Sequence, residues 1–276
     1  MSFKIAYCAG HYLGTAGKRI PASLDKNQTC EWTLNDRVAD HFATAALEYE
    51  GVELLRTDDP SGTHFIDIPE RTAKANKWGA DIYLDIHHNA AGRVFSGGGV
   101  EAYSYPKSAE GKLYRDAIYN AVIEAGGLRG NRARPLQEKK FDSLTLTKMT
   151  AVLVEYGFMD SKTDAPIILT DLYAKKVAYG TMEGIAKVAG LKKKPVAQEK
   201  PVEYTLKLRQ LFKGCEGDDV RALQILLNGR GHNCGDADGV FGEKTGNAVE
   251  AFQRKHGLTP DRIVGANTMA RLLGDK

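Results

Sequence analysis

Polar side chains end three apolar runs of this sequence, and their types could hold a metal ion. The run IAYCA leads to His11, the run IYLDI leads to His87, and the run AVLV leads to Glu155. Functional groups of open parallel sheets collect at the carboxyl ends of the strands, so these side chains could meet at one sheet edge. A further acid, Glu31, opens a predicted helix, where the helix dipole favours a carboxylate.

Two histidines and a carboxylate are a sufficient ligand set for a catalytic zinc ion, which keeps a fourth position for water. His11, His87 and Glu31 would supply such a set. Their spacing alone does not identify the site, because the sequence has no HExxH motif with two histidines one helical turn apart. Successive side chains of a strand alternate, so we expect His88 on the opposite side of its strand and outside the metal site.

The elements that must position these side chains follow from the hydrophobic pattern. Short apolar runs alternate with stretches of helical period over residues 1–190, which predicts an α/β fold with a largely parallel twisted sheet flanked by helices. The expected strands are residues 4–9, 52–55, 81–86, 100–105 and 151–155. Helices are expected from residue 31 onward and over residues 69–78, 109–124 and 171–188.

The last part of the chain predicts a separate small domain. Residues 191–201 read LKKKPVAQEKP, a lysine- and proline-rich stretch that can neither bury a face nor continue a helix. Residues 191–205 are therefore predicted to link a domain of residues 1–190 to one of residues 206–276. In the latter, helical spacing recurs between glycine-rich turns without a clear strand, which predicts a small all-α three-helix domain.

Composition and charge exclude several classes of protein. The 276 residues are 42% hydrophobic and 26% charged, which is typical of a globular chain and not of a disordered or fibrous one. No window approaches the ~18 consecutive apolar residues of a membrane span, and a net charge of +3 is too small to indicate nucleic acid. The cysteines contain no CxxC pair and are predicted to be thiols, with a bridge or an extra ligand from Cys8 and Cys30 as the alternative.

Several separated stretches of residues 1–190 share motifs with a known family. These stretches read AGH, CEWTLN, GVELLRTDD, ERTAKANKWGADIYLDIHHNA, GGVEAYSY and AVLVEYGFMD. In this order they resemble zinc-dependent N-acetylmuramoyl-L-alanine amidases of the Amidase_3 type. The resemblance implies Zn²⁺ ligation by His11, by Glu31 with Asn35 four residues on, and by His87. It implies that Glu155 is the catalytic carboxylate.

Residues 206–276 carry a second pattern. Its motif positions include Gln224, Asp238, Gly239 and Gln253, and the stretch resembles the peptidoglycan-binding type 1 module. Both resemblances have departures. Arg262 stands where the module normally has glycine. In the first domain, Asp85 stands two positions before His87, where the amidase family usually has serine.

The two resemblances together imply a zinc-dependent peptidoglycan hydrolase that cuts the amide between N-acetylmuramic acid and L-alanine and is tethered to the cell wall. Because no export signal is visible, they suggest an endolysin made in the cytoplasm and released through a holin-type lesion. A bacterial autolysin acting outside the cell is the alternative. A zinc peptidase that cuts within the stem peptide and a wall-binding protein with an inactive site also stay open, as does the oligomeric state.

Overall fold

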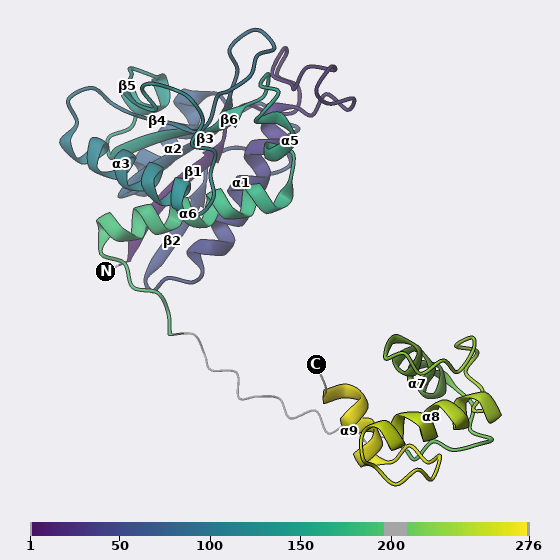
Figure 1. Ribbon diagram of the computed structural model, residues 1–276. Helices are drawn as coiled ribbons and strands as arrows, with labels where there is room; N and C mark the ends of the chain where they lie inside the picture. The colour runs from purple at the N-terminus through teal and green to yellow at the C-terminus, as the bar shows by residue number, and fades with distance from the viewer. Residues whose placement is uncertain (1, 196–208, 275–276) are drawn as a thin grey trace. The chain divides into compact units, whose positions relative to one another are not determined.

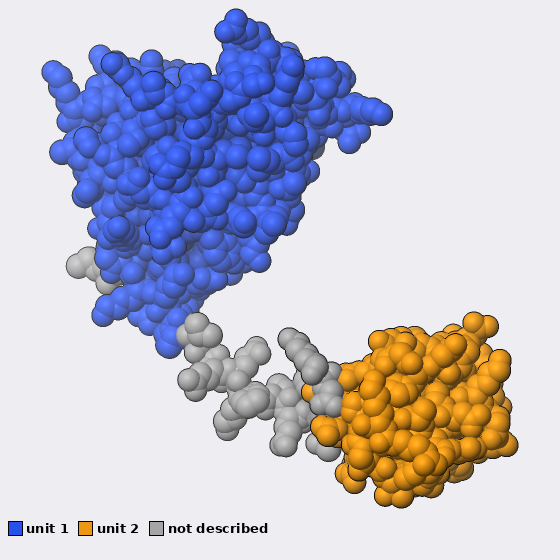
Figure 2. Space-filling view, viewed as in Figure 1, with its two compact units in different colours: residues 1–196 blue, residues 197–276 orange. Residues whose placement is uncertain are grey.

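The computed structural model describes residues 2–195 and 209–274. The chain divides into two compact units, residues Met1–Val196 and Ala197–Lys276 (Figure 2). This division falls inside the predicted linker of residues 191–205. Residues 196–205 of that linker lie outside the described residues, whereas the backbone of Lys192 and Lys194 is hydrogen-bonded to Glu50 and Glu48 of the first unit.

A mixed sheet of six strands forms the centre of the first unit (Figure 1). Its strand order is β2-β1-β3-β6-β4-β5, and every neighbouring pair is parallel except β4 with β6. The strands are β1 (Phe3–Ala9), β2 (Val52–Arg56), β3 (Ile82–Asn89), β4 (Glu101–Ser104), β5 (Leu136–Glu138) and β6 (Thr150–Phe158). The α/β prediction with a largely parallel sheet is confirmed, while β5 was not predicted.

Helices cover both faces of this sheet. One face packs against α1 (Glu31–Ala46), α3 (Ala109–Glu124) and α6 (Asp171–Ala189), which lie next to one another in Figure 1. The other face packs against α2 (Ile68–Trp78) and α4 (Asp142–Thr145), and the short α5 (Ala165–Ile168) follows β6. Along β3, Leu84 and Ile86 face the first group of helices, whereas Tyr83 faces the second, because side chains alternate.

Local signals in the sequence fix the ends of the helices. The Asp67 side chain caps α2 by accepting a hydrogen bond from the Glu70 N–H, and Pro69 occupies the first turn. Gly79, with φ of 71°, ends that helix in the left-handed conformation that glycine adopts without a Cβ penalty. The side chain of Thr170 caps α6 in the same way as Asp67 caps α2.

The second unit has three helices, α7 (Asp218–Gly229), α8 (Glu243–Lys255) and α9 (Ala266–Gly274), as the sequence predicted. Two glutamines repeat one hydrogen-bond pattern in it. The Gln224 amide donates to Asp238 and Thr245, and the Gln253 amide donates to Asp261 and Thr268 in the same way. Much of the module motif therefore holds the fold together.

Among residues 2–195 and 209–274, no helix combines the length and apolar character that a membrane span needs.

Candidate metal centre

His11 follows the carboxyl end of β1 and has an unusual backbone conformation. Its φ is 69°, which costs a residue other than glycine about 1–2 kcal/mol. Two buried side chains hold this turn in place. The Arg71 guanidinium donates to the carbonyls of Ala9 at 3.1 Å and of His11 at 2.6 Å, and the Asn35 amide donates to the Gly10 carbonyl at 3.0 Å. Strain held by its surroundings is common at functional sites.

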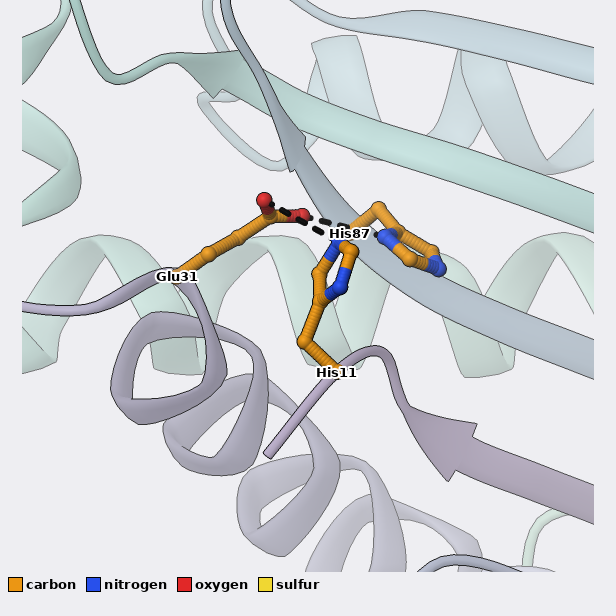
Figure 3. A group of neighbouring side chains, drawn as sticks. All are labelled: His11, Glu31 and His87. Atoms are coloured by element: carbon orange, nitrogen blue, oxygen red, sulfur yellow. Dashed lines mark hydrogen bonds and ion pairs between the residues drawn. The ribbon is translucent and has the colours of Figure 1, made fainter. Parts of the chain in front are cut away.

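Glu31, His11 and His87 lie together at this edge of the sheet (Figure 3). Glu31 is the first residue of α1, and its side chain is 1% exposed. Its Oε1 lies 3.0 Å from His87 Nδ1, and its Oε2 lies 3.2 Å from His11 Nε2. One ligand atom from each of the three residues lies within 4.8 Å of the other two. The structure thus brings together the three side chains that the sequence predicted as ligands.

This cluster fits a zinc ion in donor type and in size. Ligand atoms around a tetrahedral zinc ion, each bound at 2.0–2.2 Å, lie about 3.3–3.6 Å apart, close to the contacts of Glu31 with the two histidines. The buried Glu31 Oε2 also lies within ionic distance of Lys18 Nζ, at 3.5 Å, besides its 3.2 Å contact with His11. Burial raises the pKa of Glu31, but hydrogen bonds from His11 and His87 outweigh it and hold that pKa well below its usual value.

Asp85 contacts His87 from the side away from Glu31. Its Oδ1 lies 3.1 Å from His87 Nε2 and accepts a hydrogen bond from the Cys8 thiol at 3.0 Å. Both Asp85 and Cys8 are buried, and the cysteines are free, as predicted. A carboxylate on the second ring nitrogen fixes the tautomer and orientation of a ligating histidine. Asp85, at the position where the resembling sequences usually have serine, therefore gives His87 a charged partner.

Gly10 leaves room for the His87 ring. A Cβ at position 10 would lie 2.1 Å from Cε1 and 2.3 Å from Nε2 of His87, which is closer than real Cβ contacts. Any larger residue at position 10 must therefore displace the ring. The glycine of the AGH motif is required by this close approach and not by its own backbone angles, because its φ is not positive.

Glu155 lies beside the cluster in the next strand. In the sheet register His87 of β3 pairs with Glu155 of β6, and Glu155 pairs with Glu101 of β4. Paired residues point to the same face, so the three side chains form a row across adjacent strands. Glu155 Oε2 is buried and has no hydrogen-bond partner in the described residues. Burial raises the pKa of Glu155 to about 8, opposed by His87 and reinforced by Glu31.

His88 and Asn35 lie outside the ligand cluster. The His88 ring points to the opposite face of β3 and bonds through Nδ1 to Asn35 Oδ1 at 2.8 Å. Both polar atoms of the Asn35 side chain are engaged elsewhere, because Oδ1 contacts His88 and the amide nitrogen donates to the Gly10 carbonyl in the turn before His11. Sequence analysis missed Arg71, although its position inside the matched stretch ERTAKAN was a usable signal.

Comparisons with known proteins agree with this geometry. A family model described as N-acetylmuramoyl-L-alanine amidase matches residues 5–187. The chain belongs to this amidase family. A second model, described as a putative peptidoglycan binding domain, matches residues 216–272.

Curated relatives include amidases and an endolysin. The chain is 36% identical over 149 residues to the sporulation-specific N-acetylmuramoyl-L-alanine amidase of Bacillus subtilis (strain 168), covering 53% of this chain and 54% of that protein. It is 34% identical over 188 residues to N-acetylmuramoyl-L-alanine amidase CwlM of Bacillus licheniformis, covering 67% and 69%. It is 34% identical over 163 residues to the endolysin of Bacillus phage SPP1, covering 54% and 56%. The chain thus spans little more than half of the first and third of these relatives.

Solved amidases share the fold of the first unit. The catalytic domain of CwlV from Bacillus (Paenibacillus) polymyxa superposes with a TM-score of 0.60 at 22% identity, covering 69% of this chain and 99% of that one. An N-acetylmuramoyl-L-alanine amidase from Clostridium difficile 630 superposes with a TM-score of 0.62 at 20% identity, covering 68% and 97%. At these identities the superpositions show the family's fold.

Proposed function

We propose that this chain hydrolyses the amide between N-acetylmuramic acid and the L-alanine of the peptidoglycan stem peptide. In this proposal His11, Glu31 and His87 hold one zinc ion, and Glu155 transfers protons. The observation that carries the proposal is the convergence of three ligand-type side chains beside Glu155, whose buried Oε2 has no hydrogen-bond partner among the described residues. Membership of the amidase family supports the choice of bond.

The mechanism assigns a task to each side chain. When bound, the zinc ion supplies a Lewis acid for the scissile carbonyl and makes water nucleophilic at neutral pH. Glu155 accepts the proton of the attacking water as the new C–O bond forms. It then returns this proton to the L-alanine nitrogen as the C–N bond breaks. Burial raises the pKa of Glu155 to about 8; a cation at the cluster would favour its ionised form, and the carboxylate would then be available for this step.

The supporting side chains keep this arrangement rigid. Asp85 holds the His87 ring, while Arg71 and Asn35 hold the turn that carries His11. Preorganised groups need no rearrangement during the reaction, which is a main source of catalytic rate.

The second unit is proposed to bind peptidoglycan, in line with the family model that it matches. Tethering to the wall raises the local concentration of substrate without a new contact at the active site. Similarity to a phage endolysin supports a lytic enzyme released from the cytoplasm through a holin-type lesion. Similarity to the sporulation-specific amidase supports a bacterial autolysin of the same activity.

Mass spectrometry of digested cell walls tests the activity. We expect intact glycan strands and stem peptides with free L-alanine amino termini. A cut inside the stem peptide would instead indicate a zinc peptidase, and no product from zinc-loaded protein would indicate a wall-binding protein without activity. The matched variant is Glu155→Gln, which keeps the shape of the side chain. It should bind zinc like the wild type and lose at least about 100-fold in turnover.

A further inference from the structure

A groove lies on the β4 side of Glu155. Its volume is about 560 Å³. The lining includes Phe95, Ser96, Glu101, Asn131, Arg132 and Arg134. Glu101 is two strands away from His87 in the row described above, and adjacent strands are about 4.8 Å apart. The groove therefore begins roughly 10 Å from the ligand cluster, on the side of the proton-transferring carboxyl group.

Arg132 is a fixed cation in this groove. Its Nε donates to Glu101 Oε1 at 3.0 Å, and its guanidinium carbon lies 5.0 Å from the centre of the Phe158 ring. The other oxygen of the buried Glu101 accepts hydrogen bonds from Asn89 at 2.8 Å and from the Tyr103 hydroxyl at 2.7 Å. Glu101 is thus fully engaged and holds Arg132 by one nitrogen.

Both terminal amino groups of Arg132 remain available. They donate no hydrogen bond to any residue in the described ranges. A guanidinium that is anchored through Nε can present its two terminal amino groups to a carboxylate as a planar fork. Because the anchor already restricts the side chain, binding costs less conformational entropy than it would for a free arginine.

The neighbouring segment adds positive charge. Residues 129–140 contain five Lys or Arg side chains and a single acid, Glu138. The exposed Arg134 lines the groove and makes no ion pair or hydrogen bond within the described part of the chain. With Glu101 neutralised by Arg132, the groove presents a net positive surface to an incoming ligand.

We propose that this groove binds the free carboxylate of the stem-peptide residue that follows L-alanine, with Arg132 as the fork and Arg134 as a second cation. This inference rests on the proposed function. The carboxyl group of N-acetylmuramic acid is consumed in the scissile amide, so the substrate's negative charges lie on the peptide side. Two to three extended residues span about 7–11 Å, which matches the distance from the ligand cluster to the groove. The peptide therefore leaves the cluster across Glu155 toward β4.

A matched pair of soluble muropeptides tests this assignment. The two substrates are identical except that the carboxylate of the residue after L-alanine is free in one and amidated in the other. The measured quantity is the ratio of their kcat/KM values. For the wild type we expect the free carboxylate to be preferred by about 10- to 100-fold, as for one charged hydrogen-bonded contact.

Two variants and one control give the readout. Arg132→Lys keeps the charge beside Glu101 but removes the fork, and Arg134→Gln removes an exposed cation without disturbing a described contact. Both should move the ratio toward one. The control is Arg129→Gln, which removes a charge from the same segment outside the groove lining and should keep the wild-type ratio.

The failures of the two proposals are distinguishable. If the wild type cleaves both muropeptides without preference, or if the preference survives in both variants, the groove assignment is wrong and the amidase proposal stands. If neither muropeptide yields a free L-alanine amino terminus, the proposed function fails and the groove assignment falls with it.

Discussion

The contact between Asp85 and His87 predicts that metal affinity depends on a residue that is not itself a ligand. Asp85→Asn removes the negative charge and keeps the size of the side chain. The 3.1 Å contact joins the buried Asp85 to the largely covered His87, whose side chain is 16% exposed, so solvent screens it little. Removing such a partner of a ligating histidine weakens metal binding by about 10- to 100-fold. This loss corresponds to about 1.4–2.7 kcal/mol of binding free energy.

The assay is competition for zinc between the metal-free protein and a chromophoric chelator at fixed pH. Asp36→Asn is a suitable control, because it removes a carboxylate that pairs with Arg56 and contributes no atom to the ligand cluster. Thermal melting of both metal-free variants shows whether folding is affected. If Asp85→Asn binds zinc within about twofold of the wild type while the fold is intact, our reasoning about the support of His87 is wrong.

Three further predictions concern separate parts of the chain. Gly10→Ala should weaken zinc binding in the same competition assay, because the new Cβ would lie 2.1 Å from the His87 ring; wild-type affinity would show that the ring has room to move. Burial lowers the pKa of His88 to about 3. Below pH ~6.5, its usual pKa, His88 therefore binds a proton in the unfolded chain but stays neutral in the folded one. The wild type should therefore lose about 2 kcal/mol of unfolding free energy relative to His88→Gln between pH 7.5 and pH 5, measured on the metal-free proteins by urea titration; a difference that does not change with pH would refute the assignment. A fragment of residues 1–195 should cleave soluble muropeptides but sediment less with purified walls than the full chain, and equal sedimentation would argue against tethering by the second unit.

Much of the fold could be predicted because its main elements carry strong periodic signals. The parallel strands β1, β3 and β6 each contain a short run of mostly apolar residues, and α1 and α6 repeat apolar residues at helical spacing. By contrast, β5 is only three residues long, half exposed and without alternation, so it has no local signature. The antiparallel direction of β4 against β6 depends on strand order, which short-range pattern does not contain.

The candidate site also has a part that the sequence predicts and a part that it does not. The positions of His11, His87 and Glu155 at strand ends, and of Glu31 at a helix start, predicted that these residues lie close together. This prediction was possible because the carboxyl ends of parallel strands meet at one edge of the sheet. The partners of these residues come from distant parts of the chain. Asp85 is two residues from His87 in sequence, yet the sequence does not show which side-chain rotamer of His87 brings Nε2 to the Asp85 carboxylate. Contacts of this kind arise from packing and become visible only in the folded structure.

The central claim is that three side chains share one zinc ion beside Glu155. Anomalous diffraction at the zinc edge, measured on crystals of the zinc-loaded full chain, tests it most directly. We predict one peak at about 2.0–2.2 Å from a ligand atom of each of His11, Glu31 and His87. A peak held by other residues, or none at this cluster in zinc-saturated crystals, would contradict the account.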